Sequence, residues 1–167
     1  WRVQRRLGAH QLALESIRTL VVPAEQGAAL TAAVADLCEV FEIRYGVELA
    51  IVVAAESRPK HAIYLGDSGR VRCLAKKDSF SMHREGARVY IAGDGQRGLL
   101  NGVYALCGEL LGARWYWAGD LGLELVGSAN VTFPEGLWRE EPAYVQRTFY
   151  PMNGDFGRRN RLVRHFQ

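Results

Sequence analysis

The chain has 167 residues, enough for one compact domain with a full core and too few for two ordinary ones. Hydrophobic residues make up 49% of it and charged residues 23%, which excludes disorder as the main state. The net charge of +3 comes from scattered arginines, and no apolar run reaches the ~18 residues of a membrane span, so we expect neither a nucleic acid nor a membrane as a partner.

The first part of the chain predicts a strand, a helix and a second strand. Residues 1–15 have no clear period and are interpreted as a leading strand or an arm. The β-branched run 17–22 predicts a strand, and the run 47–54, apolar almost throughout, is typical of an interior strand covered on both faces. Between them, apolar residues recur every three or four positions over 24–45, which predicts an amphipathic helix with one core face.

The middle of the chain predicts a hairpin and a second helix. A short strand over 61–65 leads into the polar stretch 67–77, which we interpret as a loop. Residues 80–83 and 89–92 flank a Glu-Gly turn and predict a β-hairpin. The apolar positions over 95–111 predict a helix. Small residues on one row of this helix would let its backbone approach the sheet closely: Gly98, Gly102 and Ala105.

The last third of the chain contains two strand patterns and then a change of organisation. Residues 114–118 predict a strand and 125–133 a short edge segment. The segments 134–136 and 140–142, which contain proline, mark the exit from this unit. Residues 144–150 predict a new strand, after which an arginine-rich helix begins.

The final residues are interpreted as the opening of a second unit. A lone strand and the first turn of a helix cannot bury their apolar faces by themselves. The pattern therefore predicts one α/β domain over 1–140 and, over 141–167, a linker with the start of a neighbouring unit.

A glycine motif at the start of the second helix matches the dinucleotide-binding fingerprint. Gly93, Gly95 and Gly98 form G-x-G-x-x-G directly after a strand, and Asp120 follows after another strand. Against a nucleotide site, Asp94 places a carboxylate where the phosphates must approach, and the preceding strands form a hairpin. We favour the alternative, in which Asp94 caps the helix with its side chain and the glycines permit a tight turn. A dinucleotide-binding domain remains an alternative function.

The cysteines and histidines predict no metal or cofactor site. The cysteines lack C-x-x-C spacing, and we interpret all of them as core thiols: Cys38, Cys73 and Cys107. The histidines are isolated and show no metal-ligand spacing: His10, His61, His83 and His165. We therefore expect no metal and no cofactor.

The second helix and the strand after it carry a resemblance to a known family. Residues 97–104 read RGLLNGVY, and residues 109–116 read ELLGARWY. This pattern resembles the small α/β domain before the catalytic barrel in family 20 β-N-acetylhexosaminidases and family 67 α-glucuronidases, and it is similar to uncharacterised bacterial relatives of both. Further segments agree in order and spacing: IYLG at 63–66, DSFSM at 78–82 and EPAYVQR at 141–147.

The resemblance implies an α+β fold. The expected sheet is mixed and largely antiparallel with two long helices on one face, like the second domain of hexosaminidases, and the first strand of a truncated (β/α)8 barrel follows it. Residues 1–140 would form a non-catalytic accessory domain that packs against the barrel and braces it, and 141–167 would form the linker and the barrel's start. The parent enzyme would hydrolyse glycosidic bonds in a polysaccharide or glycan. The same resemblance favours a secreted or periplasmic location.

We expect no catalytic residue in this chain. Glycoside hydrolysis usually needs two carboxyl groups, or one acid and a substrate acetamido group, and in the resembled families these acids come from later barrel strands. The carboxylates here form no convincing pair. Asp36, Glu39 and Glu42 fall on or near the polar side of the first helix. Glu140 is placed in the linker, and Glu109 is interpreted as structural.

The candidate substrate contacts lie near the end of the chain. The resemblance implies that Arg147, at the end of the first barrel strand, binds sugar hydroxyls through its planar donor fork, and the alternative is pairing with a domain-interface carboxylate. Tyr150 and Asn153 would follow on the barrel's C-terminal face. An alternative function is a stand-alone carbohydrate-binding or interaction module. Strand alternation puts Trp115 and Trp117 on one side as a sugar-stacking platform, although packing is the reading that we favour for them.

Overall fold

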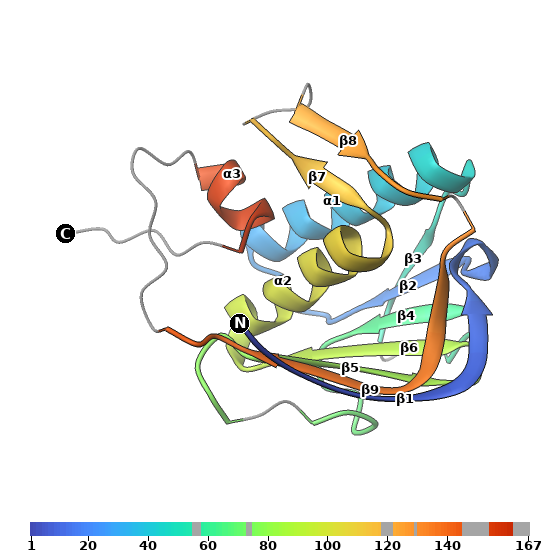
Figure 1. Ribbon diagram of the computed structural model, residues 1–167, viewed down its shortest axis with the longest axis horizontal. Helices are drawn as coiled ribbons and strands as arrows, with labels where there is room; N and C mark the ends of the chain where they lie inside the picture. Colours follow the sequence, from blue (N-terminus) through green and yellow to red (C-terminus); the bar gives the residue numbers. More distant parts are fainter. Residues whose placement is uncertain (55–57, 73–74, 118–121, 129, 145–153, 162–167) are drawn as a thin grey trace.

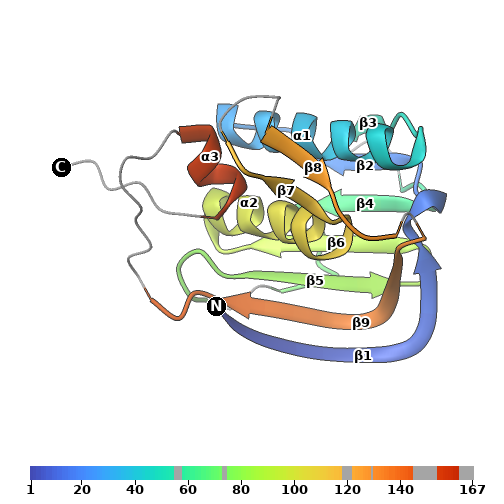
Figure 2. The same ribbon diagram turned by 45° about the horizontal axis from the view of Figure 1, so that its top comes forward.

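One sheet and two long helices organise the part of the chain that the structure describes (Figure 1). The computed structural model describes residues 1–54, 58–72, 75–117, 122–128, 130–144 and 154–161. The seven strands follow across the sheet in the order β1 (Arg2–Ala13), β9 (Thr132–Glu141), β5 (Phe80–Glu85), β6 (Arg88–Gly93), β4 (Ala62–Leu65), β2 (Thr19–Val22) and β3 (Ala50–Val53). Helices α1 (Ala28–Tyr45) and α2 (Gly95–Ala105) lie on the same face, as predicted (Figures 1 and 2).

The sheet is mixed, which confirms the predicted class. Its β1, β9, β5 and β6 strands pair antiparallel, whereas β6, β4, β2 and β3 pair parallel. The antiparallel ladders are the longer ones, and they include the predicted hairpin of β5 and β6, with Phe80 opposite Gly93 and Glu85 opposite Arg88. The parallel half arises because α1 carries the chain from β2 to β3 by a crossover.

The prediction of an interior strand over 47–54 is wrong. Strand β3 lies at the edge of the sheet, and the side chain of Ile51 is 54% exposed. The short strand β4 takes the interior place beside β2, and all of its residues are buried. An apolar run is compatible with either position, so the topology of the crossover decides which strand is covered.

The prediction of an exit at 134–136 is also wrong. Strand β9 runs through this segment and pairs with β1 on one side and β5 on the other. The ladder with β1 shifts register between Leu7 and Gln11, opposite Gly136 and Pro134. Gly136 has φ +121, which an L side chain rarely adopts. A bulge with a glycine and a proline therefore continues the strand where the sequence suggested its end.

The main core lies between the sheet and the two helices. On α1, Leu30, Val34, Leu37 and Phe41 are buried, which confirms the predicted apolar row. The helix ends at Gly46, which adopts the left-handed conformation. A second, smaller apolar cluster lies on the helix-free face of the sheet: Val21, Ala62, Tyr64, Val71, Tyr90 and Ala92.

The close approach of α2 to the sheet is confirmed. A Cβ added at Gly102 would lie 2.5 Å from the Cγ2 of Ile91 on β6. After Ala105 the helix continues as the π-helical turn η2 (Leu106–Leu110), so the predicted helix over 95–111 is formed by two parts.

Three shorter elements complete the described fold. Strands β7 (Ala113–Trp115) and β8 (Leu123–Leu125) form a separate two-stranded sheet. Helix α3 (Gly154–Arg159) comes after β9 in the sequence and lies close to α1, α2 and β7 (Figures 1 and 2). None of the helices in the described ranges is both long and apolar enough to cross a membrane.

Candidate functional site

The first and third glycines of the turn between β6 and α2 pack closely against the protein's own backbone. A Cβ added at Gly93 would lie closer than 3.0 Å to backbone atoms of Leu99 and Gly98, and one at Gly98 equally close to the carbonyl oxygen of Ser79. The amide of Asp94 donates to that same carbonyl oxygen at 2.9 Å. Close packing therefore requires the first and third glycines whether or not the turn binds a phosphate, whereas a Cβ at Gly95 would meet nothing within 4 Å, so the dinucleotide reading stays an alternative.

The predicted capping of α2 by a carboxylate is wrong. Asp94 is the N-cap residue, but its side chain makes no capping hydrogen bond. Gly95, with φ +65, makes the tight turn possible, as predicted. Its neighbour Arg97 pairs with the buried carboxylate of Asp78 at 3.6 Å, so this arginine has a structural partner in the segment before β5.

A buried cluster of charges connects α3 to the two long helices. Asp36 on α1 is only 6% exposed, and its carboxylate accepts hydrogen bonds from Arg159 at 2.7 and 3.1 Å. The hydroxyl of Tyr104 on α2 donates to the same carboxylate at 2.6 Å. Arg158 donates to the Tyr104 hydroxyl at 2.8 Å and lies 3.7 Å from Asp36. Asp36 lies on a side of α1 that α3 covers, which is why this charged residue is buried.

The cluster shifts the pKa of each of its members. Burial alone would raise the pKa of Asp36, but hydrogen bonds from Arg159 and Tyr104 and the charges of Arg159 and Arg158 outweigh it and hold that pKa below its ordinary value of 3.8. Burial, together with the neighbouring Asp36, raises the pKa of Tyr104. The tyrosine therefore stays a neutral donor, and the aspartate is ionised.

A second ion cluster holds the end of α3 to the sheet. Glu140 is 3% exposed and accepts hydrogen bonds from the indole of Trp138 and from Arg161, both at 2.9 Å. Arg161 also lies 3.7 Å from Glu109, which supports the structural role predicted for that residue. Asn160 donates to the carbonyl oxygen of Trp115 at 3.2 Å. The placement of Glu140 in a linker is wrong, since β9 extends to Glu141 and buries it.

Acid is expected to unfold the chain partly through Asp36. The unfolded carboxyl group titrates at its ordinary pKa and the folded one lower, so its contribution to stability is present above about pH 4 and is lost as the pH falls through the folded value. We expect the free energy of unfolding to fall more steeply between about pH 4 and pH 2 in the unmodified chain than in Asp36→Asn. Urea titrations at a series of pH values measure both slopes, and equal slopes would contradict the assignment.

The aromatic segment after η2 is divided between core and surface. Trp115 is 4% exposed and packs edge-on against Tyr104, with ring centroids 5.6 Å apart. Trp117 is 69% and Tyr116 53% exposed. Packing of Trp115 is thus confirmed, and the sugar-stacking platform of two tryptophans is not formed, because only Trp117 is accessible.

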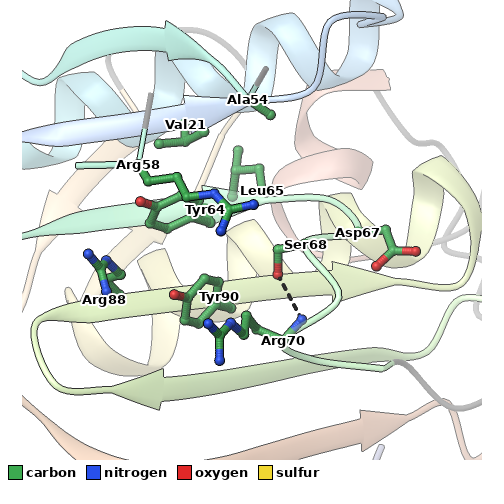
Figure 3. A pocket seen from close by; sticks show the side chains of 10 residues that line it. All are labelled: Val21, Ala54, Arg58, Tyr64, Leu65, Asp67, Ser68, Arg70, Arg88 and Tyr90. Carbon is green, nitrogen blue, oxygen red and sulfur yellow. Dashed lines mark hydrogen bonds between the residues drawn. The ribbon is translucent and has the colours of Figure 1, made fainter. Parts of the chain in front are cut away.

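A cavity opens on the helix-free face of the sheet (Figure 3). Its volume is about 420 Å³, within the range of roughly 300–1,000 Å³ that is typical of ligand pockets. Tyr64 on β4 and Tyr90 on β6 are opposite each other in the register of these strands, and the centroids of their stacked rings are 4.9 Å apart. Three arginines line the same cavity: Arg58, Arg70 and Arg88.

Some residues singled out in the sequence lie outside the described residues: Arg147, Tyr150, Asn153, Cys73 and His165. Cys107 is buried and Cys38 half-buried, and burial raises the pKa of both thiols. Within the described ranges, no group of three His, Cys, Asp or Glu residues is arranged to hold a metal ion.

Neither the charge clusters nor the cavity was found from the sequence. The sequence contains the opposite charges of these clusters, Asp36 and Glu140 on one side and the arginines near the end of the chain on the other. It does not indicate that residues so far apart in the chain lie in contact. The cavity has a weak signal, namely tyrosines in equivalent places of two strand patterns.

Solved structures with a similar fold occur among glycoside hydrolases. The GH20 β-N-acetylhexosaminidase from Streptomyces coelicolor A3(2) matches with a TM-score of 0.55 and 14% identity, over 87% of this chain and 26% of that one. The Flavobacterium johnsoniae chitobiase FjGH20 gives 0.57 and 13%, over 87% and 20%. CpGH84B gives 0.51 and 13%, over 87% and 22%.

These similarities show the fold, and this chain spans about a quarter or less of the length of those proteins. The resemblance to a family 20 hexosaminidase domain is thereby confirmed as a likeness of fold, whereas the resemblance to family 67 stays a prediction. No family model matches the chain, and no curated protein matches it.

Proposed function

We propose that residues 1–140 form a non-catalytic accessory domain that braces the catalytic barrel of a glycoside hydrolase. The parent enzyme would hydrolyse glycosidic bonds in a polysaccharide or glycan. The fold supports this proposal, because the proteins that share it include β-N-acetylhexosaminidases in which the matching part covers about a quarter of the chain. Residues 141–167 would then belong to the linker and the start of the barrel.

The observation that carries the proposal is the docking of α3 by buried ion pairs. Arg159 forms an ion pair with Asp36, and Arg161 forms one with Glu140. Arginines from the segment after the domain thus pair with buried carboxylates inside the domain. Two buried carboxylates would be costly in an isolated domain without these cations. The acids are therefore placed to fix the segment that follows, which is the task of a brace.

The exposed aromatic residues beside α3 support the same proposal. Trp117 and Tyr116 extend from the end of β7, which lies next to α3 in Figure 1. A large exposed indole beside a docking segment is typical of a surface that another domain covers. We propose that the barrel covers it.

In the proposed enzyme, Arg147, Tyr150 and Asn153 would contact the sugar. They lie between β9 and α3 in the sequence, where the first barrel strand and its loop would stand. The planar fork of Arg147 suits two neighbouring hydroxyl oxygens, and residues just after a barrel strand reach the face where active sites lie.

The experiment is to express the longer reading frame and assay it on chromogenic glycosides, with an N-acetyl-β-glucosaminide first. We expect hydrolysis, and in Arg147→Ala a fall in kcat/KM of about tenfold or more through lost bonds to the sugar. Arg2→Ala, which removes an exposed arginine from the edge strand β1, is the matched control and should keep full activity. A longer protein that contains no barrel, or one that cleaves no glycoside, would refute the proposal.

A further inference from the structure

The cavity on the helix-free face has an aromatic floor and a cationic rim. Tyr64 and Tyr90 form the floor, and both hydroxyls point toward the side where Arg88 lies (Figure 3). Arg58 and Arg70 line the cavity together with the two tyrosines, and Arg70 lies beside Tyr90 in Figure 3. The helices pack on the other face of the sheet, so this cavity is separate from the docking site of α3.

The described residues that line the cavity carry an excess of positive charge. Among the described residues that line it are three arginines and one carboxylate, that of Asp67, which already accepts a hydrogen bond from the amide of Gly69 at 2.9 Å. Arg70 has Glu85 at 3.8 Å as its partner, in an exposed pair that contributes little. Arg58 makes no ion pair with any residue that the structure describes. An anion is the ligand charge that these guanidinium groups would bind.

The polar groups at the back of the cavity are held in place by the fold. The hydroxyl of Tyr64 donates to the carbonyl oxygen of Pro59 at 2.7 Å, and the Nε of Arg88 donates to the same oxygen at 3.1 Å. These bonds fix the segment that carries Arg58 against β4 and β6. The Nη atoms of Arg88 are not used by this contact, so the guanidinium can still bind a ligand.

We propose that this cavity binds an acidic saccharide, a sugar unit that carries a carboxylate. The arginines would pair with the carboxylate, and the stacked tyrosines would supply the flat floor and a hydroxyl for the ring of the sugar. The anionic part of the ligand is argued from the charges in the cavity. The saccharide part rests on the proposed function, since a domain beside a glycan-cleaving barrel meets glycan chains.

The test is calorimetric titration of the 167-residue chain with α-1,4-linked digalacturonate and with neutral α-1,4-linked digalactose, which differ in the C6 carboxylates. We expect saturable binding of digalacturonate and affinity at least about tenfold lower for digalactose. The variant with Arg58→Gln and Arg70→Gln should lose about tenfold in affinity for digalacturonate or more. The matched control carries Arg2→Gln and Arg6→Gln on β1, loses the same charge, and should bind like the unmodified chain.

Equal affinity for the two sugars, or an equal loss in both arginine variants, would overturn the inference. Saturable binding of sodium sulfate with the affinity of digalacturonate would also overturn it, because the site would then be a simple anion site. Different results would refute the inference and the proposed function. Binding of digalacturonate by a chain whose longer reading frame encodes no barrel would support the cavity and refute the brace.

Discussion

Replacing Asp36 with alanine is expected to lower the free energy of unfolding by about 3–5 kcal/mol, the usual cost of removing one partner from a buried ion pair. The side chains of Asp36 and Arg159 are each 8% exposed, and their closest contact is 2.7 Å. The substitution would leave Arg159 without its buried anion and the Tyr104 hydroxyl without its acceptor. Chemical denaturation with circular dichroism measures the loss.

The matched control is Glu42→Ala, which removes an exposed carboxylate from the same helix. It should change the free energy of unfolding by no more than about 0.5 kcal/mol, as exposed substitutions usually do. If the two variants lost the same free energy of unfolding, the buried cluster would contribute no more to stability than an exposed carboxylate does. The docking of α3, on which the proposed brace rests, would then have no energetic support.

Replacing Gly93 with alanine is expected to destabilise the chain by more than about 3 kcal/mol, because overpacking against the backbone leaves no flexible side chain that could move away. The new methyl group would overlap the first turn of α2 at Leu99 and Gly98. Helix α2 would have to separate from the hairpin of β5 and β6. Thermal unfolding of the purified variant, or its failure to accumulate as soluble protein, measures the effect.

The control for this change is Gly8→Ala on the edge strand β1. A Cβ there meets the carbonyl oxygen of Glu135 at 3.7 Å, an ordinary contact, so the stability should change by less than about 1 kcal/mol. A Gly93→Ala chain that keeps its stability would mean that the turn is not closely packed. Protection of the unmodified chain against heat by NAD would support the dinucleotide reading.

Local sequence patterns predicted most of the helices and strands that the structure contains. The apolar row of α1, the hairpin of β5 and β6 and the small residues of α2 all depend on neighbours within a few positions. The prediction that the Asp94 side chain caps α2 is wrong although Asp94 is the N-cap residue, and its own amide donates to the carbonyl oxygen of Ser79. The fold class followed from these elements and from the resemblance in 97–116.

Strand order and β9 could not be read in the same way. An apolar run such as β3 is equally compatible with an edge and an interior place, and only the path of the chain through α1 decides between them. A proline and a glycine normally end a strand, but β1 accepts both in β9 through a shift of register. Pairing partners in a sheet are far apart in sequence, and periodicity contains no information about them.

The sequence by itself determined the helices, the hairpin and the tight glycine turn, because each of these arises from contacts between near neighbours along the chain, and the resemblance in 97–116 predicted the likeness of fold. Only the tertiary structure decided which polar residues are buried. Asp36 has the spacing of a solvent-facing residue until Arg159, 123 positions later, covers it with a cation. The cavity of Tyr64 and Tyr90 likewise exists only because parallel β4 and β6 are aligned so that the two rings are opposite each other.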